Sequence, residues 1–258
     1  MEPPEVLVAR EGAIVTLTFN RPEARNAMTW GMYERLYEIC EEVDADEAIR
    51  VLVLKGAGKA FVAGTDISQF LKFDGAEDGL QYERDGVRRF GRVARVTKPV
   101  IAQIEGAAVG GGFGIAAGAD LRVATPDARF GLPIARTLGN CLSMQNYAAF
   151  MDLLGASRLK EMVLTARLLS AEEALAAGFV HVIVPAPEIE ARVRELAGKV
   201  ASHAPITLAV TKEAIRRIQA ARAIPDGDDL VRRTYGSEDF REGVRAFVEK
   251  RAPRWTGK

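Results

Sequence analysis

Residues 106–118 read GAAVGGGFGIAAG, a cluster of glycines that runs into an apolar segment. Glycine lets the backbone bend where no side chain fits, and it lets bare backbone amides approach a ligand. The cluster follows VIAQI at 100–104, whose apolar residues predict a buried strand, and a helix is expected to start near Gly111. The first amides of a helix have no partner inside it and carry partial positive charge. The stretch therefore predicts a helix start whose amides can face a ligand oxygen.

Two other interpretations of the cluster stay open from these residues. Gly112, Gly114 and Ala117 match the pattern G-x-G-x-x-A of dinucleotide-binding proteins, which would indicate an NAD-dependent oxidoreductase. The match is incomplete, because further residues separate Ile104 from Gly112 and no acidic residue ends a second strand about 20 residues on. The cluster can also be an ordinary turn between a strand and a helix.

A second loop of the same kind lies at KAFVAGTDISQF, residues 59–70. Ala63 and Gly64 follow a strand there, and Asp66 can cap the short helix after them, so a backbone amide is exposed near Thr65. One such amide stabilises a developing oxyanion by roughly 3 to 4 kcal/mol. Each loop alone is most simply a structural turn, whereas the two together favour a catalytic interpretation.

The rest of the chain predicts an α/β fold, because strand patterns and helix patterns alternate along it. Residues 5–10 and 13–19 predict a β-hairpin, and a helix is expected from Thr29, its N-cap, to about Val43. Only helices are expected after Pro187. The other predicted elements are strands at 50–56, 121–124 and 179–184, and helices at 79–96, within 142–163 and from Ser170.

The composition of the 258-residue chain is that of an ordinary globular protein, with 48% hydrophobic and 27% charged residues. Lysine plus arginine equals aspartate plus glutamate at 35 each, so no net field favours nucleic acid or an anionic membrane as a partner. Cys40 and Cys141 are far apart and in no metal-like spacing, so no metal is expected. No apolar segment approaches the roughly 20 residues that span a bilayer, and no secretory signal is recognisable. A cytoplasmic protein is therefore expected.

Five segments carry a resemblance to a known family: NRPEARNAM at 20–28, FVAGTDI at 61–67, EGAAVGGGFGIAAGADLRVATPDARFGLP at 105–133, LSAEEALAAGFVHVIV at 169–184 and REGVRAFVEKRAPRW at 241–255. In this order, the chain resembles the enoyl-CoA hydratase/isomerase (crotonase) family nearly from end to end. The resemblance implies a crotonase-like spiral of ββα turns over residues 1–198 that binds a CoA thioester. It also implies a C-terminal helical region, residues 199–258, that joins subunits into a homotrimer or a dimer of trimers. Such proteins act on acyl-CoA thioesters, as lyases or isomerases of fatty acid metabolism, with no cofactor besides the CoA of the substrate.

The resemblance also assigns site residues at the matching motif positions. It implies that the backbone N–H groups of Thr65 and Gly111 form the oxyanion hole for the thioester carbonyl. Phe247 and Lys250 match positions from which a neighbouring subunit contacts the adenine and the phosphates. The CoA-binding residues implied along the nucleotide are Arg25, Ala27, Ala63, Asp66 and Ile67. From the residues alone, Arg21 and Arg25 form either a local cationic site or part of a solvated loop.

Two positions depart from the family pattern, because the family's hydratases carry glutamates where this chain has Gly114 and Ile134. Neither side chain can transfer a proton, and general acid or base groups contribute about 10²–10⁴-fold to a rate. The usual hydration mechanism therefore cannot be carried over. His181 and His203 are expected to be structural. The acyl-pocket candidates that remain are Asn140 and Ser143, and the carboxylates within possible reach, most of them expected to be solvated, are Asp74, Glu77, Asp78, Glu83 and Asp85.

These observations favour an enzyme that stabilises a thioester enolate with a backbone oxyanion hole. Decarboxylation of a malonyl-type thioester fits best, because the loss of CO₂ generates the enolate without a protein base. A non-catalytic acyl-CoA-binding protein is the alternative, since the CoA motifs are present while both usual acids are missing. The NAD-dependent oxidoreductase suggested by the glycine spacing is a third hypothesis.

Overall fold

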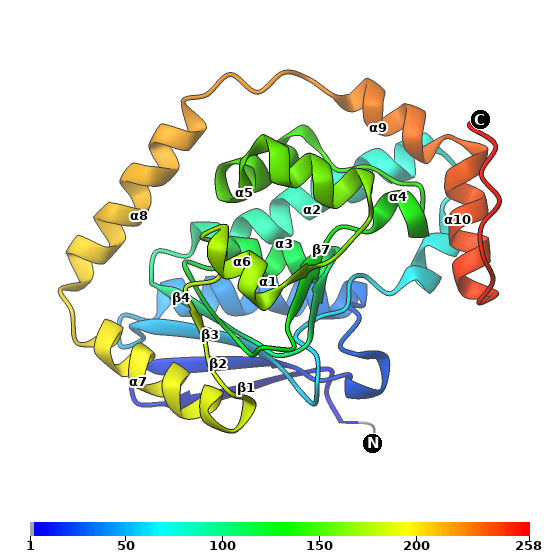
Figure 1. Cartoon of the computed structure of the whole chain (residues 1–258). Coiled ribbons are helices and arrows are strands. Elements are labelled where there is room, and N and C mark those ends of the chain that lie inside the picture. The colour runs from blue at the N-terminus through cyan, green and yellow to red at the C-terminus, as the bar shows by residue number, and fades with distance from the viewer. Residues whose placement is uncertain (1–2) are drawn as a thin grey trace.

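A six-stranded sheet forms the centre of the molecule, in the order β1-β2-β3-β4-β6-β9 (Figure 1). The structure is a computed structural model that describes residues 3–258, apart from the side chain of Phe90. β1 and β2 pair antiparallel, and the other neighbours pair parallel. The strands are β1 (Val6–Glu11), β2 (Ile14–Phe19), β3 (Val51–Gly56), β4 (Val100–Ile104), β6 (Leu121–Ala124) and β9 (Val182–Ile183). The predicted hairpin and the predicted alternation of strands and helices are confirmed.

A second, smaller sheet lies next to the first and contains the start of the glycine cluster. Its three strands, in the order β5-β7-β8, are β5 (Ala107–Val109), β7 (Arg129–Gly131) and β8 (Leu169–Ser170). A single bridge, between Val62 and Ala108, links this sheet to the loop after β3. The two sheets therefore bring the two glycine-containing loops to the same place.

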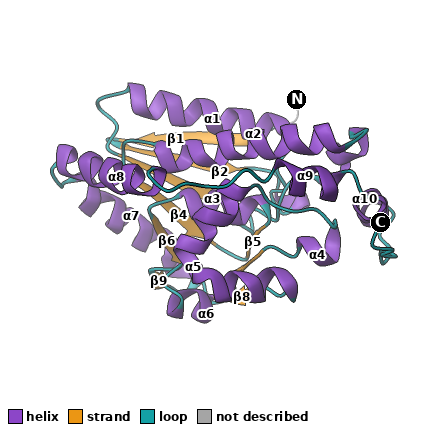
Figure 2. Cartoon of the chain, turned by 90° about the horizontal axis from the view of Figure 1, so that it is seen from above, coloured by secondary structure: helices purple, strands orange, loops and turns teal. Residues whose placement is uncertain are grey.

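Helices surround the sheets, as the view from above shows (Figure 2). None of those in the described part of the chain is long and apolar enough to cross a membrane. The α-helices are α1 (Trp30–Ala45), α2 (Ala76–Arg95), α3 (Gly111–Gly118), α4 (Ile134–Thr137), α5 (Met144–Leu164), α6 (Ala171–Ala176), α7 (Ile189–Ala201), α8 (Pro205–Ala220), α9 (Asp228–Tyr235) and α10 (Glu238–Val248). Short 3-10 helices are η1 (Pro22–Ala24), η2 (Ile67–Lys72) and η3 (Ala186–Glu188).

Both faces of β3 are buried, which explains its uninterrupted apolar run. Leu52 and Leu54 pack in the core with residues of α1 and α3. Val51 and Val53 pack on the opposite face against α7. Because successive strand residues point to opposite faces, a strand covered on both sides is apolar at every position rather than at every second one.

Local capping signals fix several helix starts where the sequence predicts them. The Thr29 side chain accepts a hydrogen bond from Met32 N at 3.1 Å and caps α1, and Ser170 with Glu173 forms a capping box at the predicted start of α6. A cap of this kind stabilises a helix by about 1 kcal/mol. Asp66 caps η2 by accepting from Ser68 N.

Two predicted element boundaries are wrong, each for a local reason. α2 begins at Ala76 rather than at residue 79, because the Asp78 carboxylate accepts from Asp74 N and Gly75 N and caps an earlier turn. The predicted strand 179–184 is reduced to β9 (Val182–Ile183). The amides of residues 179 and 180 both donate to Ala174 O and close the end of α6 instead.

The C-terminal helices divide into a packed pair and an exposed helix. α9 and α10 form an apolar cluster with η2 and α2 that includes Phe70, Leu80, Tyr235 and Phe240. α8 has no buried residue and lies at the outer edge of the molecule (Figure 1). The predicted boundary at residue 198 falls inside α7, which covers the central sheet. The division into residues 1–198 and 199–258 stays a prediction.

Candidate active site

Two glycine-containing loops meet at the junction of the two sheets. Val62 N donates to Ala107 O at 2.9 Å, and Val109 N donates to Val62 O at 3.1 Å. A Cβ atom on Gly112 would lie 2.0 Å from Val62 O, so only glycine allows this approach. Gly110 has a φ of 56°, which turns the chain from β5 into α3. The glycines of the opening cluster therefore serve backbone contact between two loops.

Thr65 and Gly111 lie close together, and neither amide has a backbone acceptor among residues 3–258. Met28 holds the loop of residues 59–70 on both sides of Thr65, because Met28 N donates to Gly64 O and Asp66 N donates to Met28 O. A Cβ atom built on Gly111 would lie 3.2 Å from Thr65 Oγ1, so the two residues are in contact distance of each other. Gly111 begins α3, so its N–H lies at the partially positive end of the helix.

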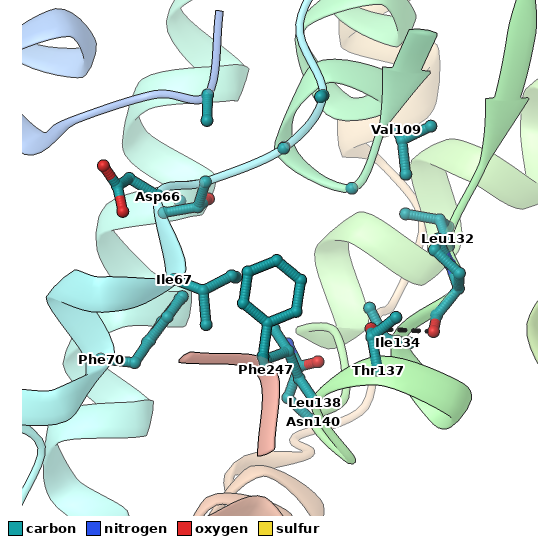
Figure 3. A pocket seen from close by; sticks show the side chains of 18 of the residues that line it. Asp66, Ile67, Phe70, Val109, Leu132, Ile134, Thr137, Leu138, Asn140 and Phe247 are labelled. Carbon is teal, nitrogen blue, oxygen red and sulfur yellow. Dashed lines mark hydrogen bonds between the residues drawn. The ribbon is translucent and has the colours of Figure 1, made fainter. Parts of the chain in front are cut away.

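A cavity of about 680 Å³ adjoins both amides. Much of its wall is apolar, and Ile67, Leu132 and Ile134 surround it together with Phe247 (Figure 3). Its volume is in the range of small-molecule sites. The residues with predicted site roles that line it are Arg25, Ala27, Ala63, Thr65, Asp66, Ile67, Gly111, Ile134, Asn140, Phe247 and Lys250. The structure therefore brings most of the predicted residues to one cavity within a single chain.

Two of the predicted positions lie outside this lining. Gly114 is buried inside α3, where no side chain extends toward the cavity. Ser143 caps α5 through Asn146 N and lines a neighbouring cavity instead. Ile134 does line the first cavity and is 7% exposed, so an apolar side chain occupies that wall.

One rim of the cavity carries unpaired positive charge. Arg25 and Lys250 have no ion pair or side-chain hydrogen bond within the described part of the chain. Arg21 is different, because it pairs with Asp66 at 3.1 Å and donates to Ala27 O at 2.7 Å. Arg21 therefore holds the loop of residues 21–27 against the Asp66 loop, while the two other cations stay available at the rim.

A cluster of hydroxyl groups behind Thr65 was not predicted from the sequence. Tyr33 Oη lies 2.9 Å from Thr65 Oγ1, and Tyr82 Oη lies 3.1 Å from the same atom. Burial raises the pKa of Tyr33 to about 12, so its hydroxyl stays neutral. These contacts come from α1 and α2 and fix the side chain of Thr65, which lines the cavity.

Glu83 is the buried carboxyl of this site, and it comes from α2. It is 5% exposed and lines the cavity, whereas Asp74, Glu77 and Asp78 are exposed. Its Oε2 accepts from Ser143 N at 2.7 Å, and its Oε1 accepts from Tyr235 Oη at 2.8 Å. Burial raises the pKa of Glu83 to about 7, against the opposing effect of these hydrogen bonds. The helical spacing could have indicated that Glu83 is buried, because residues three apart lie on the same face of a helix and Leu80 is buried.

Asn140 extends the network that starts at Glu83. Its Nδ2 donates to Tyr235 Oη at 3.2 Å. Its Oδ1 is buried and has no hydrogen-bond partner within residues 3–258, although the residue lines the cavity. A buried polar atom without a partner costs about 1 to 3 kcal/mol, which a ligand donor or a water molecule would recover.

The cysteines and the partly buried histidine contribute no reactive group to this cavity. Burial raises the pKa of Cys40 to about 12 and that of Cys141 to about 11, so both remain thiols at neutral pH. His181 Nδ1 accepts from Arg122 N at 3.1 Å, which is a structural contact on the edge of β6.

The fold and the cavity define a class of protein: an α/β protein in which two glycine-containing loops line one largely apolar cavity. Residues 9–258 match the sequence model of the family described as enoyl-CoA hydratase/isomerase. The chain belongs to the enoyl-CoA hydratase/isomerase family, and this membership supports an enzyme that acts on acyl-CoA.

Individual relatives are similar to this chain over nearly its whole length. The short-chain-enoyl-CoA hydratase of Clostridium acetobutylicum is 33% identical over 255 residues, which cover 97% of each chain. The structure of an enoyl-CoA hydratase/carnithine racemase from Magnetospirillum magneticum has a TM-score of 0.81 at 32% identity and covers 100% of this chain and 97% of that one. A methylmalonyl-CoA decarboxylase in complex with 2-nitronate-propionyl-CoA has a TM-score of 0.90 at 27% identity and covers 99% of both chains. These similarities confirm the predicted crotonase-like fold class.

Proposed function

We propose that this protein decarboxylates a malonyl-type CoA thioester and stabilises the enolate with the backbone amides of Thr65 and Gly111. The observation that carries the proposal is that Thr65 and Gly111, whose amides have no backbone acceptor in the described chain, line one cavity whose Ile134 wall is apolar. Two oxyanion donors aimed at one thioester oxygen would each contribute roughly 3 to 4 kcal/mol to the stability of an enolate.

The missing glutamates are what separates decarboxylation from hydration in this site. Hydration needs a group that activates water, and neither Gly114 nor Ile134 can do so. Decarboxylation starts from a carboxylate that the substrate itself carries, and the electron pair of the broken bond forms the enolate. An apolar wall destabilises the substrate carboxylate more than it destabilises neutral CO₂, so the lining that prevents hydration favours this reaction. The structural similarity to the methylmalonyl-CoA decarboxylase supports the same choice.

The substrate would lie with its CoA along the cationic rim. Arg25 and Lys250 would contact the phosphates, because both are unpaired cations that line the cavity in the described chain. Ala27, Ala63, Asp66 and Ile67 would lie along the nucleotide, and Phe247 would stack on its base, either in its own subunit or from a neighbour. Asn140 is the polar group available to the acyl portion, since its Oδ1 lacks a partner among the described residues.

A substrate panel tests this proposal. Purified protein is incubated with methylmalonyl-, malonyl- and crotonyl-CoA, and the products are identified by mass spectrometry. The expected result is CO₂ release from a malonyl-type thioester and no efficient hydration of crotonyl-CoA. Rapid hydration would contradict the proposal. Tight acyl-CoA binding in calorimetry without any turnover would instead support the non-catalytic binding protein, and NAD(H) binding detected by fluorescence would support the oxidoreductase.

We also propose that the chain assembles into a homotrimer or a dimer of trimers in the cytoplasm. α8 supports an assembly, because its apolar side chains Ile206, Val210, Ile215 and Ile218 are between 53% and 77% exposed. Exposed apolar surface of this kind is typical of a protein interface. Light scattering is expected to give three or six chain masses, and replacing Ile206 and Val210 by aspartate should lower that mass. A monomeric wild-type protein would contradict the assembly.

A further inference from the structure

Glu83 separates the first cavity from a second one. The second cavity, of about 350 Å³, is lined by Glu83 and by residues on both sides of it in α2, together with the start of α5 and the segment before α9. At its edge the exposed Arg84 pairs with Asp228 at 2.7 Å. One buried carboxyl therefore borders both the substrate cavity and a second cavity that reaches the surface of the molecule.

The surroundings of Glu83 leave its charge without a counter-ion. Within residues 3–258 it forms no ion pair, and its hydrogen bonds come from neutral groups: Tyr235 Oη, at 2.8 Å, Ser143 N, at 2.7 Å, and the side chain of Asn146. The titratable groups packed around it are neutral at pH 7: Tyr33, Tyr82, Cys141, Tyr147 and Tyr235. Two cations on its own helix pair elsewhere, Arg84 with Asp228 at 2.7 Å and Arg89 with Glu34 at 2.8 Å. Burial without compensation favours the protonated carboxyl and raises the pKa of Glu83 to about 7.

We propose that Glu83 is the acid that protonates the enolate carbon, and that water in the second cavity returns the proton to Glu83. This inference rests on the decarboxylation proposed above. The other carboxylates at the substrate cavity lie at the rim: Glu23 is 72% exposed, and Asp66 pairs with Arg21.

The proposed step balances in protons and electrons. The bond between the α carbon and the substrate carboxylate breaks, CO₂ leaves, and its bonding electron pair forms the enolate, whose negative oxygen is held by the Thr65 and Gly111 amides. The enolate carbon then takes the proton of the Glu83 carboxyl and forms a C–H bond. The Glu83 carboxylate regains a proton from water, so the net reaction consumes one solvent proton for each CO₂ released.

The test combines one variant, a pH profile and a deuterium label, with methylmalonyl-CoA as the probe. Glu83→Gln keeps the shape of the side chain and one acceptor oxygen, but its amide group cannot donate an acidic proton. It is expected to lower kcat at least about 100-fold with little change in KM. Glu77→Gln is the matched control, because Glu77 is 76% exposed on the same helix, and it should retain the wild-type rate.

The pH dependence has a defined direction. A donor must be protonated, so the wild-type kcat/KM is expected to fall as pH rises through about 7. If Glu83 instead acted as the base of a hydration, the rate would rise through the same range. In D₂O, the wild-type propionyl-CoA should carry deuterium at one face of the α carbon, and residual product of the Glu83→Gln variant should be labelled at both faces. A purely structural role of Glu83 would not change this stereochemistry.

The outcomes separate the two proposals. If the wild-type protein releases CO₂ but Glu83→Gln keeps its rate, pH profile and labelling, the role of Glu83 is refuted while the proposed function stands. If no malonyl-type thioester is turned over, both are refuted. Should the variant fail to fold by circular dichroism, the wild-type profile decides alone, because a rate that does not fall above pH 7 contradicts an acid with this titration.

Discussion

Replacing Gly111 by alanine is expected to lower kcat/KM for the thioester substrate by about 100-fold or more while the chain stays folded. The new Cβ atom would lie 2.2 Å from Tyr33 Oη and 3.2 Å from Thr65 Oγ1, so the hydroxyl cluster or the start of α3 has to move. Either movement displaces Thr65 or Gly111, whose amides are the proposed oxyanion donors. Steady-state kinetics with the turned-over thioester measure the loss, and circular dichroism checks the fold.

A second substitution makes this prediction specific. Tyr33→Phe removes the hydroxyl that the new methyl group would meet, and the next ring atom, Tyr33 Cζ, is 3.5 Å away. The double variant Tyr33→Phe with Gly111→Ala is therefore expected to regain much of the lost activity relative to Gly111→Ala alone. A single variant Gly111→Ala with wild-type kinetics would show that the geometry of this amide does not limit the reaction.

Replacing Arg122 by alanine is expected to lower the free energy of unfolding by about 3 to 5 kcal/mol. Arg122 is 3% exposed and donates to the carbonyl oxygens of Ala116, Ala119 and Phe179. Its guanidinium also lies 4.7 Å from the centre of the Phe179 ring. Burial lowers the pKa of Arg122 to about 10, which still leaves the side chain charged at pH 7. The truncation would leave buried carbonyls without donors, and urea unfolding measures the effect.

The same substitution connects stability with the site. The carbonyls of Ala116 and Ala119 are at the C-terminal end of α3, where a cation also interacts favourably with the helix dipole. The other end of α3 provides the Gly111 amide, so loosening the helix should reduce activity as well. Arg129→Ala is the control, because its exposed side chain donates to nearby carbonyls of the same loop, and it should cost below about 1 kcal/mol. A loss of similar size in both variants would contradict the role assigned to Arg122.

Much of the architecture could be predicted because it depends on neighbouring residues. The turn at Gly12, the Thr29 cap and the Ser170 capping box are contacts over two or three residues, and the structure contains all of them. The apolar run of β3 likewise predicts a strand covered on both faces. The errors occurred where a local contact competes with the periodic pattern, as at the cap formed by Asp78.

Only those residues of the site that lie in short local motifs could be predicted from the sequence. The backbone positions Thr65 and Gly111 lie in recognisable motifs, since glycine and short loops are visible in the sequence. Glu83 could be named only as one carboxylate among several, because Tyr235, its partner, is 152 residues away along the chain. The missing hydrogen-bond partner of Asn140 Oδ1 could not be predicted either, because the side-chain amide contacts Tyr235, which is 95 residues away along the chain.

The sequence by itself determined the family, the alternation of strands and helices, and the two glycine-containing loops, because these properties are encoded in short motifs and in periodic apolar positions. Only the tertiary structure decided which carboxylate is buried at the cavity, which cations stay unpaired at its rim and how α3 is held at both ends. Those properties depend on solvent exclusion and on partners that the fold brings together from distant segments. The glycines of residues 106–118 allow the backbones of the two loops to pack against each other. The packing of α2 against α9 places Glu83 at the cavity that these loops line.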